Sequence, residues 1–391
     1  MCDDRAAYST VVGPRWAVIE LLELWSRLET PRRLEVNRPV LIELTDIGRD
    51  TADRFMHRES PAIAVSHHQE GAGIQVTAAL QAELMTGHYD RGIGPLPQLM
   101  WEPGFLFTGA ARGVHPLPGR GDNPRQGDDR WNEALRDFRH SALKRSRGFD
   151  PRKLSQLVRS VPIIPADQQA TGGRVAVLDT GMLDVNGDMI DFINCHKNRP
   201  GSVKSDDWHG HGTAVAHVIK AVRGNATIHP IRVLNDKKVG HSYEVLPALI
   251  WALFSGLYDL INASLSSLVS GACDSSMGKS IDYLMEYCRA NSKTFPILVA
   301  AAGNGAGVKS GYPARLRDVI VALALDHNNQ PAAYNSVPPQ GSITKWAYGG
   351  DESDPLGDLT YLHIPNGPTG PEAKLWGTSF ATAAVSGAHL P

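Results

Sequence analysis

From about residue 172 onward, continuous apolar runs alternate along the chain with longer segments that mix apolar and polar residues. Short apolar runs such as VAVL and ILVAA have the length of strands buried on both faces, and the longer segments between them have helical spacing. Strands separated by helices predict a parallel sheet with helices on both faces. The predicted elements are Val175–Leu178, His211–Val222, Ile228–Val233, Tyr243–Ser255, Leu260–Leu265, Met277–Ala290, Pro296–Ala301 and Val319–Leu325.

The first hundred residues follow a different pattern. An amphipathic helix is predicted from Trp16 to Leu28. The elements after it follow the order strand, helix, two strands, helix and strand, which is typical of a ferredoxin-like α+β unit. These elements are Pro39–Thr45, Asp50–His57, Ala62–Ser66, Gly73–Thr77, Ala78–Thr86 and Leu96–Trp101.

Residues 102–130 are rich in Gly, Pro, Arg and Asp, which favours an exposed linker, and a helix of mixed charge is predicted over residues 131–145. The surplus of Lys and Arg between residues 112 and 160 is either a basic patch for an acidic partner or a solvated face, and the second is commoner. The predicted organisation is a helical segment (1–35), a small α+β unit (36–105), a linker with a charged helix (106–165) and an α/β domain (166–391).

Composition limits the class of protein. The 391 residues are 42% hydrophobic and 20% charged, as in soluble globular proteins, and the net charge of −2 predicts no nucleic-acid partner. No apolar run reaches the roughly 18 residues of a membrane span, and the first residues lack a secretory signal, so we expect a cytoplasmic protein without a membrane partner. Four cysteines without a CxxC pair indicate reduced thiols, although an even number permits disulfides.

Two residues suited to proton transfer lie at the boundaries of predicted elements. Asp179 ends the apolar run VAVL, so it is expected at the carboxyl edge of the sheet, where open α/β sheets build their sites. His211 stands between glycines at the start of a predicted helix. Taken alone, Asp179 is better interpreted as a residue that starts a turn. A metal site at His209, His211 and His217 is disfavoured, because no pair of histidines has the i, i+4 spacing beside a carboxylate.

Two further residues complete a chemical set. Ser379 begins a predicted helix of small residues, where the helix dipole favours a developing oxyanion. Asn304 follows a predicted strand in the sequence Gly-Asn-Gly and offers an amide donor. Alone, the serine is a helix N-cap and the asparagine a turn residue. Together the four residues supply a nucleophile, an imidazole base, a carboxylate that orients it and an oxyanion donor, which predicts nucleophilic catalysis by Ser379.

Six segments around these residues resemble the subtilisin-like (subtilase) serine peptidases, and they occur in the order of that family. The segments are VAVLDTG (Val175–Gly181), GHGTAVAHVI (Gly210–Ile219), INASLSS (Ile261–Ser267), VAAAGNG (Val299–Gly305), GYPARLRDVIVALALD (Gly311–Asp326) and GTSFATAAVSG (Gly377–Gly387). The resemblance implies a mainly parallel, doubly wound, seven-stranded sheet with the active site at its carboxyl edge. The expected chemistry needs no cofactor. Structural calcium occurs in the resembled family, but no metal site is readable in this sequence.

The resemblance implies roles for individual residues. Asp179, His211 and Ser379 are expected to form a catalytic triad, with Asn304 as an oxyanion donor. The residues expected to line the substrate site are Ser264, Leu265, Ser266, Ala301, Ala302 and Gly303.

Four features depart from the family pattern. His217 and Ser266 stand at usual glycine positions, so we expect altered helix packing and a narrower substrate pocket. Ala383 replaces a proline, which leaves the serine helix unkinked. The usual C-terminal helices are expected to be lacking after Pro391, and we hypothesise that the helix over residues 16–28, or a partner protein, occupies their place.

The predicted function is a serine endopeptidase that hydrolyses proteins or peptides through an acyl-enzyme. The alternative is a subtilase-like regulatory or scaffold protein that is inactive, or active only with a regulatory partner. The α+β unit is similar to the pro-domains that precede the catalytic domain in many subtilases, which predicts a zymogen with a built-in chaperone and inhibitor. A permanent sensing domain is the other interpretation of this unit.

Overall fold

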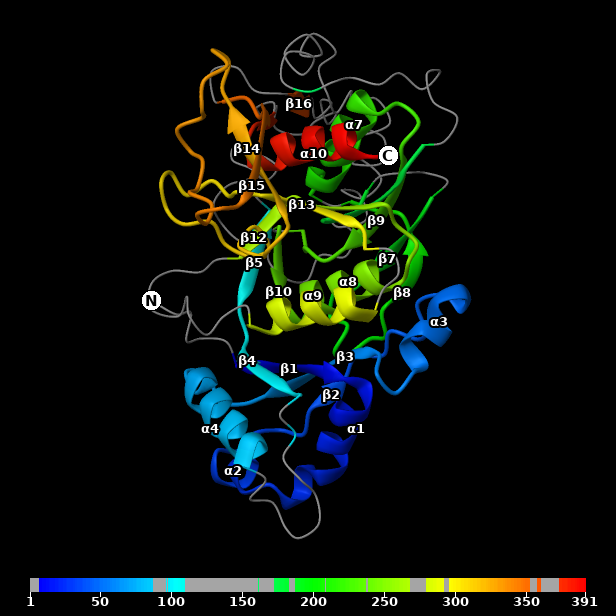
Figure 1. Ribbon diagram of the computed structural model, residues 1–391, viewed down its shortest axis with the longest axis vertical. Helices are drawn as coiled ribbons and strands as arrows, with labels where there is room; N and C mark the ends of the chain where they lie inside the picture. Colours follow the sequence, from blue (N-terminus) through cyan, green and yellow to red (C-terminus); the bar gives the residue numbers. More distant parts are fainter. Residues whose placement is uncertain are drawn as a thin grey trace, which may run out of the picture.

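The computed structural model describes residues 7–86, 96, 98–109, 161, 172–182, 187–207, 209–236, 238–267, 279–291, 295–351, 357–359 and 373–391. The helix predicted over residues 131–145 lies outside this part of the chain. Within it, every helix is too short or too polar to span a membrane. An N-terminal unit (residues 7–103) lies at one end of the long axis and the α/β domain at the other (Figure 1).

The α/β domain is built on one eight-stranded sheet. Its strands lie in the order β15 (Ile343–Tyr348), β14 (Ile320–Leu325), β13 (Ile297–Ala301), β11 (Leu260–Ala263), β6 (Arg174–Asp179), β9 (Thr227–Arg232), β7 (Asp188–Asp191) and β8 (Gly201–Lys204). Neighbouring strands are parallel except β8, which pairs antiparallel with β7. The predicted parallel, doubly wound sheet of seven strands is confirmed, with β8 added as an antiparallel edge strand. A separate antiparallel pair is formed by β16 (Gly357–Leu359) and β17 (Ala373–Leu375).

Different helices cover the two faces of this sheet (Figure 1). Along β6, Val175 and Val177 belong to the core that includes α7 (His211–Val222) and α10 (Thr378–His389). The alternating residues Ala176 and Leu178 belong to the core that includes α8 (Ser242–Phe254) and α9 (Lys279–Asn291). Because side chains alternate across a strand, a wholly apolar run is buried on both faces.

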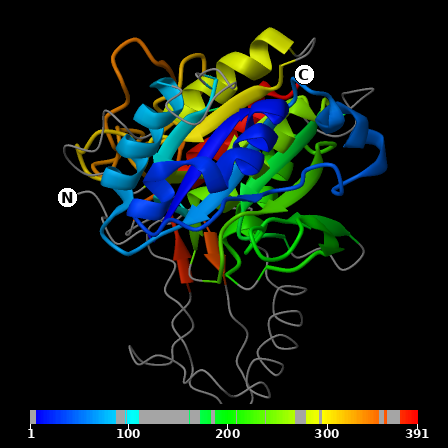
Figure 2. The ribbon, with the colours of Figure 1, turned by 90° about the horizontal axis from the view of Figure 1, so that it is seen from below.

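The N-terminal unit is a four-stranded antiparallel sheet with helices on its outer face (Figures 1 and 2). Its strands lie in the order β2 (Val40–Leu41), β3 (Pro61–His67), β1 (Tyr8–Pro14) and β4 (Met100–Pro103). The helices on that face are α1 (Arg15–Leu24), η1 (Trp25–Arg27), α2 (Glu29–Arg33) and α4 (Gly73–Thr86). Helix α3 (Arg49–Met56) lies apart from them, with the ring of Phe55 against that of Phe254. With α1 after β1 and α4 after β3, the order of strands and helices is that of a ferredoxin-like unit in which α3 is inserted.

Two sequence-based assignments in this unit are wrong. Tyr8–Pro14 is an inner strand of the sheet, although the sequence pattern predicts no strand there. The unit therefore begins before the predicted boundary at residue 36. Gly73–Thr77 was predicted as a strand but is the first part of α4. Val76, Leu80 and Leu84 recur every four residues and are all buried, and this helical period outweighs local strand propensity.

The helix predicted near the N-terminus is present as α1, but its hypothesised place is wrong. Its buried residues Val18 and Leu21 pack in the core of the N-terminal unit with Val11 and Leu80. The serine-bearing helix α10 lies at the opposite end of the molecule (Figure 1). The apolar face of α1 packs against β1, the strand that precedes it directly in the sequence. This contact is favoured because it closes only a short loop of chain.

After β4 the chain enters the α/β domain and forms β5 (Leu106–Gly109). β5 lies in a three-stranded sheet, antiparallel to β10 (Val239–His241) on one side and to β12 (Leu265–Ser267) on the other. The prediction placed a final strand at Leu96–Trp101 and a linker from residue 106. The strand is instead Met100–Pro103, and residues 106–109 are paired on both sides.

The two parts of the molecule share an apolar core around α8. Every residue of α8 except Phe254 is buried, because the N-terminal sheet covers the face that the parallel sheet leaves open (Figure 1). Ile63 of β3 and Leu249 and Ile250 of α8 belong to this one core. At its edge, Glu102 of β4 accepts the backbone N–H of Ser280, in the first turn of α9, at 2.7 Å.

Three histidines meet at this interface. The ring centroid of His67, from β3, is 5.2 Å from that of His196, which is 4.5 Å from that of Tyr243. His241 stacks on Tyr243 at 4.9 Å. Burial lowers the pKa of all three histidines, that of His196 to about 4, and the charge of Lys197 acts in the same direction on His67 and His196. The other ionisable groups around them are Tyr8, His68, Asp191, Cys195 and Glu244.

Acid should therefore weaken the contact between the N-terminal unit and α8. Each histidine has a lower pKa when the interface is closed than its ordinary value of 6.5, so the open state binds more protons below that pH. The neutral histidines make their full contribution to the stability of the closed interface above pH 6.5. This contribution is lost as the pH falls towards 4, the pKa of His196. We expect hydrogen exchange of the β3 amides to accelerate on going from about pH 7 to about pH 5.

His196→Phe should flatten this acid response, because it removes a proton acceptor and keeps an aromatic ring of similar size. His57→Gln, at an exposed position of the N-terminal unit, is the control and should respond like the parent. Glu244, whose pKa burial raises to about 7, acts in the opposite sense but is common to all three proteins. Equal acid sensitivity of His196→Phe and the parent would contradict the assignment.

Candidate active site

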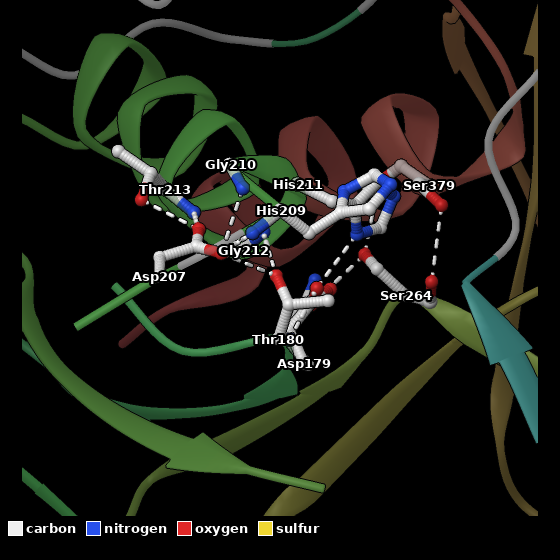
Figure 3. A network of polar contacts seen from close by, with 11 residues as sticks. Asp179, Thr180, Asp207, His209, Gly210, His211, Gly212, Thr213, Ser264 and Ser379 are labelled. Atoms are coloured by element: carbon white, nitrogen blue, oxygen red, sulfur yellow. Dashed lines mark hydrogen bonds and ion pairs between the residues drawn. The ribbon is translucent and has the colours of Figure 1, made fainter. Parts of the chain in front are cut away.

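Asp179 and His211 come together at the carboxyl edge of the sheet (Figure 3). Asp179 is the last residue of β6, His211 is the first residue of α7, and both are fully buried. The Oδ1 atom of Asp179 and the Nδ1 atom of His211 are 2.6 Å apart. Gly212 permits this close approach, because a Cβ at that position would clash with the carbonyl oxygen of Gly181.

The surroundings of Asp179 determine which nitrogen of His211 carries the proton. The same Oδ1 atom accepts the backbone N–H of Thr180 at 2.7 Å, and an ionised carboxylate is an acceptor only. Nδ1 of His211 therefore donates to it, and the neutral ring keeps its lone pair on Nε2. Nε2 is buried and makes no hydrogen bond within the described part of the chain, so it can serve as a base.

Ser379 lies in the first turn of α10, beside the ring of His211 (Figure 3). The ring of the next residue, Phe380, is 5.9 Å from that of His211. The hydroxyl of Ser379 donates to the carbonyl oxygen of Ser264 at 3.0 Å, and the hydroxyl of Ser264 donates to the carbonyl oxygen of Ser379 at 3.0 Å. The hydroxyl of the predicted nucleophile is thus hydrogen-bonded to the segment between β11 and β12. A rotation about the Cα–Cβ bond of Ser379 would turn this hydroxyl towards Nε2 of His211.

Asn304 follows β13 and contacts the start of the same helix. Its Oδ1 atom accepts the backbone N–H of Thr378 at 3.1 Å and the Thr378 hydroxyl at 3.0 Å. The carbonyl half of this amide is therefore directed at the residue before Ser379. Its NH2 half is carried on the same planar group, close to the N-terminal end of α10, where the helix dipole favours negative charge.

The residues predicted to bind substrate form two neighbouring segments. Ser264, Leu265 and Ser266 run beside β5, and Ala301, Ala302 and Gly303 continue the end of β13. In the first segment, Leu265 pairs with Gly109 and Ser266 with Thr108. A Cβ at Gly303 would lie 3.4 Å from the Oγ atom of Ser266, and one at Gly311 would lie 2.6 Å from it. The Ser266 hydroxyl therefore takes up space between these two glycines.

A second buried carboxylate, Asp207, holds the start of α7, a role that is not among the predictions from the sequence. Its oxygens accept five hydrogen bonds, from the Thr180 hydroxyl (2.8 Å), the N–H groups of His209 (3.2 Å) and Gly210 (2.7 Å), and the N–H (2.8 Å) and hydroxyl (2.6 Å) of Thr213 (Figure 3). Burial raises the pKa of Asp207, and these hydrogen bonds act against that rise. The signal in the sequence was an Asp shortly before the start of a predicted helix, where carboxylates cap free N–H groups.

Among the residues that the structure describes, no group of three or more His, Cys, Asp or Glu side chains is placed to hold a metal ion.

Comparison with protein families covers the part of the chain that carries these residues. The model of the subtilase family matches residues 170–390, which is more than half of the chain. The chain belongs to the subtilase family. Its enzyme class is accordingly that of the subtilisin-like serine peptidases.

Individual relatives are identical to this subtilase at about three in ten of the aligned positions. It is 29% identical to Subtilisin DY of Bacillus licheniformis over 45% of this chain and 67% of that protein, and 28% identical to Subtilisin Savinase of Lederbergia lenta over 56% and 75%. It is also 28% identical to the Alkaline protease of Alkalihalobacillus alcalophilus, of which it spans 53%. The solved structure of S41 Psychrophilic Protease matches with 22% identity and a TM-score of 0.40, over 56% of this chain and 75% of that one.

Asp207→Ala should destabilise this subtilase by about 2–4 kcal/mol, because five buried donors lose their acceptor. Thermal unfolding measures the change. Asp188→Asn is a suitable control, since it alters only an exposed ion pair with Lys204 and should change the free energy of unfolding by less than about 0.5 kcal/mol. A melting temperature of Asp207→Ala equal to that of the parent would show that α7 does not depend on this carboxylate.

Proposed function

We propose that this subtilase is a serine endopeptidase acting through an acyl-enzyme, and that it is made as a zymogen whose own strand β5 occupies the substrate groove. The observation that carries the proposal is the pairing of β5 with β10 and β12, with its last residue Gly109 against His211. Extended peptides commonly bind to proteins by adding a strand to an open sheet edge.

The proposed chemistry follows from the hydrogen-bond directions. The Ser379 hydroxyl turns from Ser264 to Nε2 of His211, which takes its proton as the oxygen attacks the substrate carbonyl carbon. Asp179 stabilises the imidazolium through Nδ1–H. The NH2 group of Asn304 and the backbone N–H of Ser379 hold the oxyanion. His211 then gives the proton to the leaving amine, and a water activated by the same nitrogen releases the acyl group.

The register of β5 indicates which bond is cut. Thr108 pairs with Ser266 and Gly109 with Leu265, so in a peptide bound in this register the next residue is opposite Ser264. The carbonyl oxygen of Ser264 accepts the hydroxyl of the proposed nucleophile. The bond that follows the residue opposite Ser264 is therefore the one exposed to attack, and in this sequence it joins Ala110 to Ala111.

Ser379→Ala and His211→Ala should each lower the turnover number about 10⁶-fold, which leaves no measurable peptidase activity. Asn304→Ala should retain a trace, because loss of one oxyanion donor costs about 10²–10³. Both magnitudes are those measured in subtilisin. Hydrolysis of a fluorogenic peptide checks all three variants, and turnover of Ser379→Ala at the wild-type rate would rule out the mechanism.

The zymogen proposal is tested by incubating wild type and Ser379→Ala side by side and following their intact masses. Wild type should give two fragments that meet at Ala110–Ala111, and Ser379→Ala should stay full-length. Because α8 stays covered by the N-terminal unit, the two fragments should elute together and remain inhibited until they separate. A wild-type protein that is active while still full-length would contradict the zymogen proposal and leave the peptidase proposal in place.

The second candidate function is a regulatory or scaffold protein without turnover. The hydrogen bond from Ser379 to Ser264, in place of one to His211, is the observation in its favour. A fluorophosphonate probe separates the two, because it reacts only with an activated serine. Labelling of wild type but not of Ser379→Ala would support the enzyme, and absence of labelling after β5 has been released would support the scaffold.

A further inference from the structure

Lys238 extends from a turn that is held by its own hydrogen bonds. The backbone N–H of Lys238 donates to the carbonyl oxygen of Asn235, and the N–H of Asn235 donates to that of Val239, both at 2.9 Å. The Asn235 side chain also accepts the N–H of Val239 at 3.1 Å. Lys238 has a φ of 61°, a left-handed conformation uncommon for residues other than glycine. The direction of its Cα–Cβ bond is therefore determined by the turn.

Gly109 of β5 lies directly against this side chain. Its N–H donates to the carbonyl oxygen of Lys238 at 3.2 Å. A Cβ on Gly109 would lie 2.6 Å from both Cγ and Cδ of Lys238, and 3.2 Å from Cε1 of His211. His211 is held by its hydrogen bond to Asp179, so its ring cannot move aside without disturbing that bond. The position is thus closed by the lysine stem on one side and by the imidazole on the other.

The stem of Lys238 is not a loose surface chain. Burial lowers the pKa of its amine to about 8, against the opposing charge of Asp179. The atoms nearest to Gly109 are Cγ and Cδ, which follow directly after the Cβ that the turn holds in place. They can move aside only by a change of staggered rotamer, and because Lys238 is half-buried this change costs packing free energy.

The other residues of β5 carry side chains. Leu106 and Thr108 are half-buried, and Phe107 is fully buried with its ring 5.1 Å from that of Phe105. Glycine therefore occurs at the one position of β5 where Lys238 and His211 leave no room for a Cβ.

We propose that Lys238 is a specificity-determining residue that selects substrates with glycine at the second position before the cut bond. This inference rests on the proposed endopeptidase function and on the register that puts Gly109 at that position. The substrate class is an extended peptide that carries glycine there and a small uncharged residue next to it, as in the Gly109-Ala110 sequence of this chain.

The test compares two fluorogenic peptides that differ by one methyl group, Leu-Phe-Thr-Gly-Ala-Ala and Leu-Phe-Thr-Ala-Ala-Ala. Wild type from which β5 has been released should cut the glycine peptide with a kcat/KM about 10–200-fold higher, the range known for one misplaced methylene in a pocket. Lys238→Gly, which keeps the left-handed backbone without strain, should reduce this ratio to about threefold or less.

Lys238→Met is the matched control, because it keeps an unbranched stem and loses the charge. It should retain the preference for glycine, and loss of the preference would overturn the role of the stem. In the full-length protein, Gly109→Ala should slow the cut at Ala110–Ala111, and adding Lys238→Gly should restore it.

The outcomes separate this inference from the proposed function. Equal cutting of both peptides by wild type, or an unchanged ratio in Lys238→Gly, would overturn the role of Lys238 and leave the endopeptidase intact. Cutting of neither peptide, together with no fluorophosphonate labelling, would overturn the proposed function and this inference with it.

Discussion

The burial of helix α8 between two sheets is the constraint on which the rest of the structure depends. A parallel sheet needs helices on both faces, and α8 supplies part of one face. The sequence of α8 is apolar around almost its whole circumference, so a single sheet leaves one side of it exposed to water. The N-terminal sheet covers that side and makes one continuous core with it. The position of the N-terminal unit is therefore determined by hydrophobic burial.

The N-terminal end of the same helix also holds strands β5 and β10 in place. His241 and Glu244 form a capping box there, and β10 ends at His241. The backbone N–H of Ser242 donates to the carbonyl oxygen of Phe105 at 2.9 Å, and the Tyr8 hydroxyl donates to the same oxygen at 3.0 Å. Phe105, the residue directly before β5, is thus hydrogen-bonded to the start of α8. In the proposed zymogen, covering α8 and filling the groove depend on the same contacts.

Two buried carboxylates near His211 have different surroundings and different effects. Asp179 contacts the imidazole of His211, so its charge acts on the group that moves a proton in the proposed mechanism. Asp207 is surrounded by N–H and O–H donors of the loop and first turn of α7, so its charge is used to hold that backbone. The first therefore concerns chemistry and the second the position of the histidine, and an Asp in a sequence does not by itself reveal which of the two applies.

Local signals were enough to predict the α/β sheet and the residues at its carboxyl edge. Strand-length apolar runs mark buried strands, and glycines and small residues flank Asp179, His211 and Ser379 within a few positions. Only the tertiary structure decided that residues 106–109 pair with β10 and β12 and that the Lys238 side chain lies against Gly109. Four residues in a Gly- and Pro-rich stretch carry no hydrophobic period, and strand pairing depends on partners that folding brings together from distant parts of the chain.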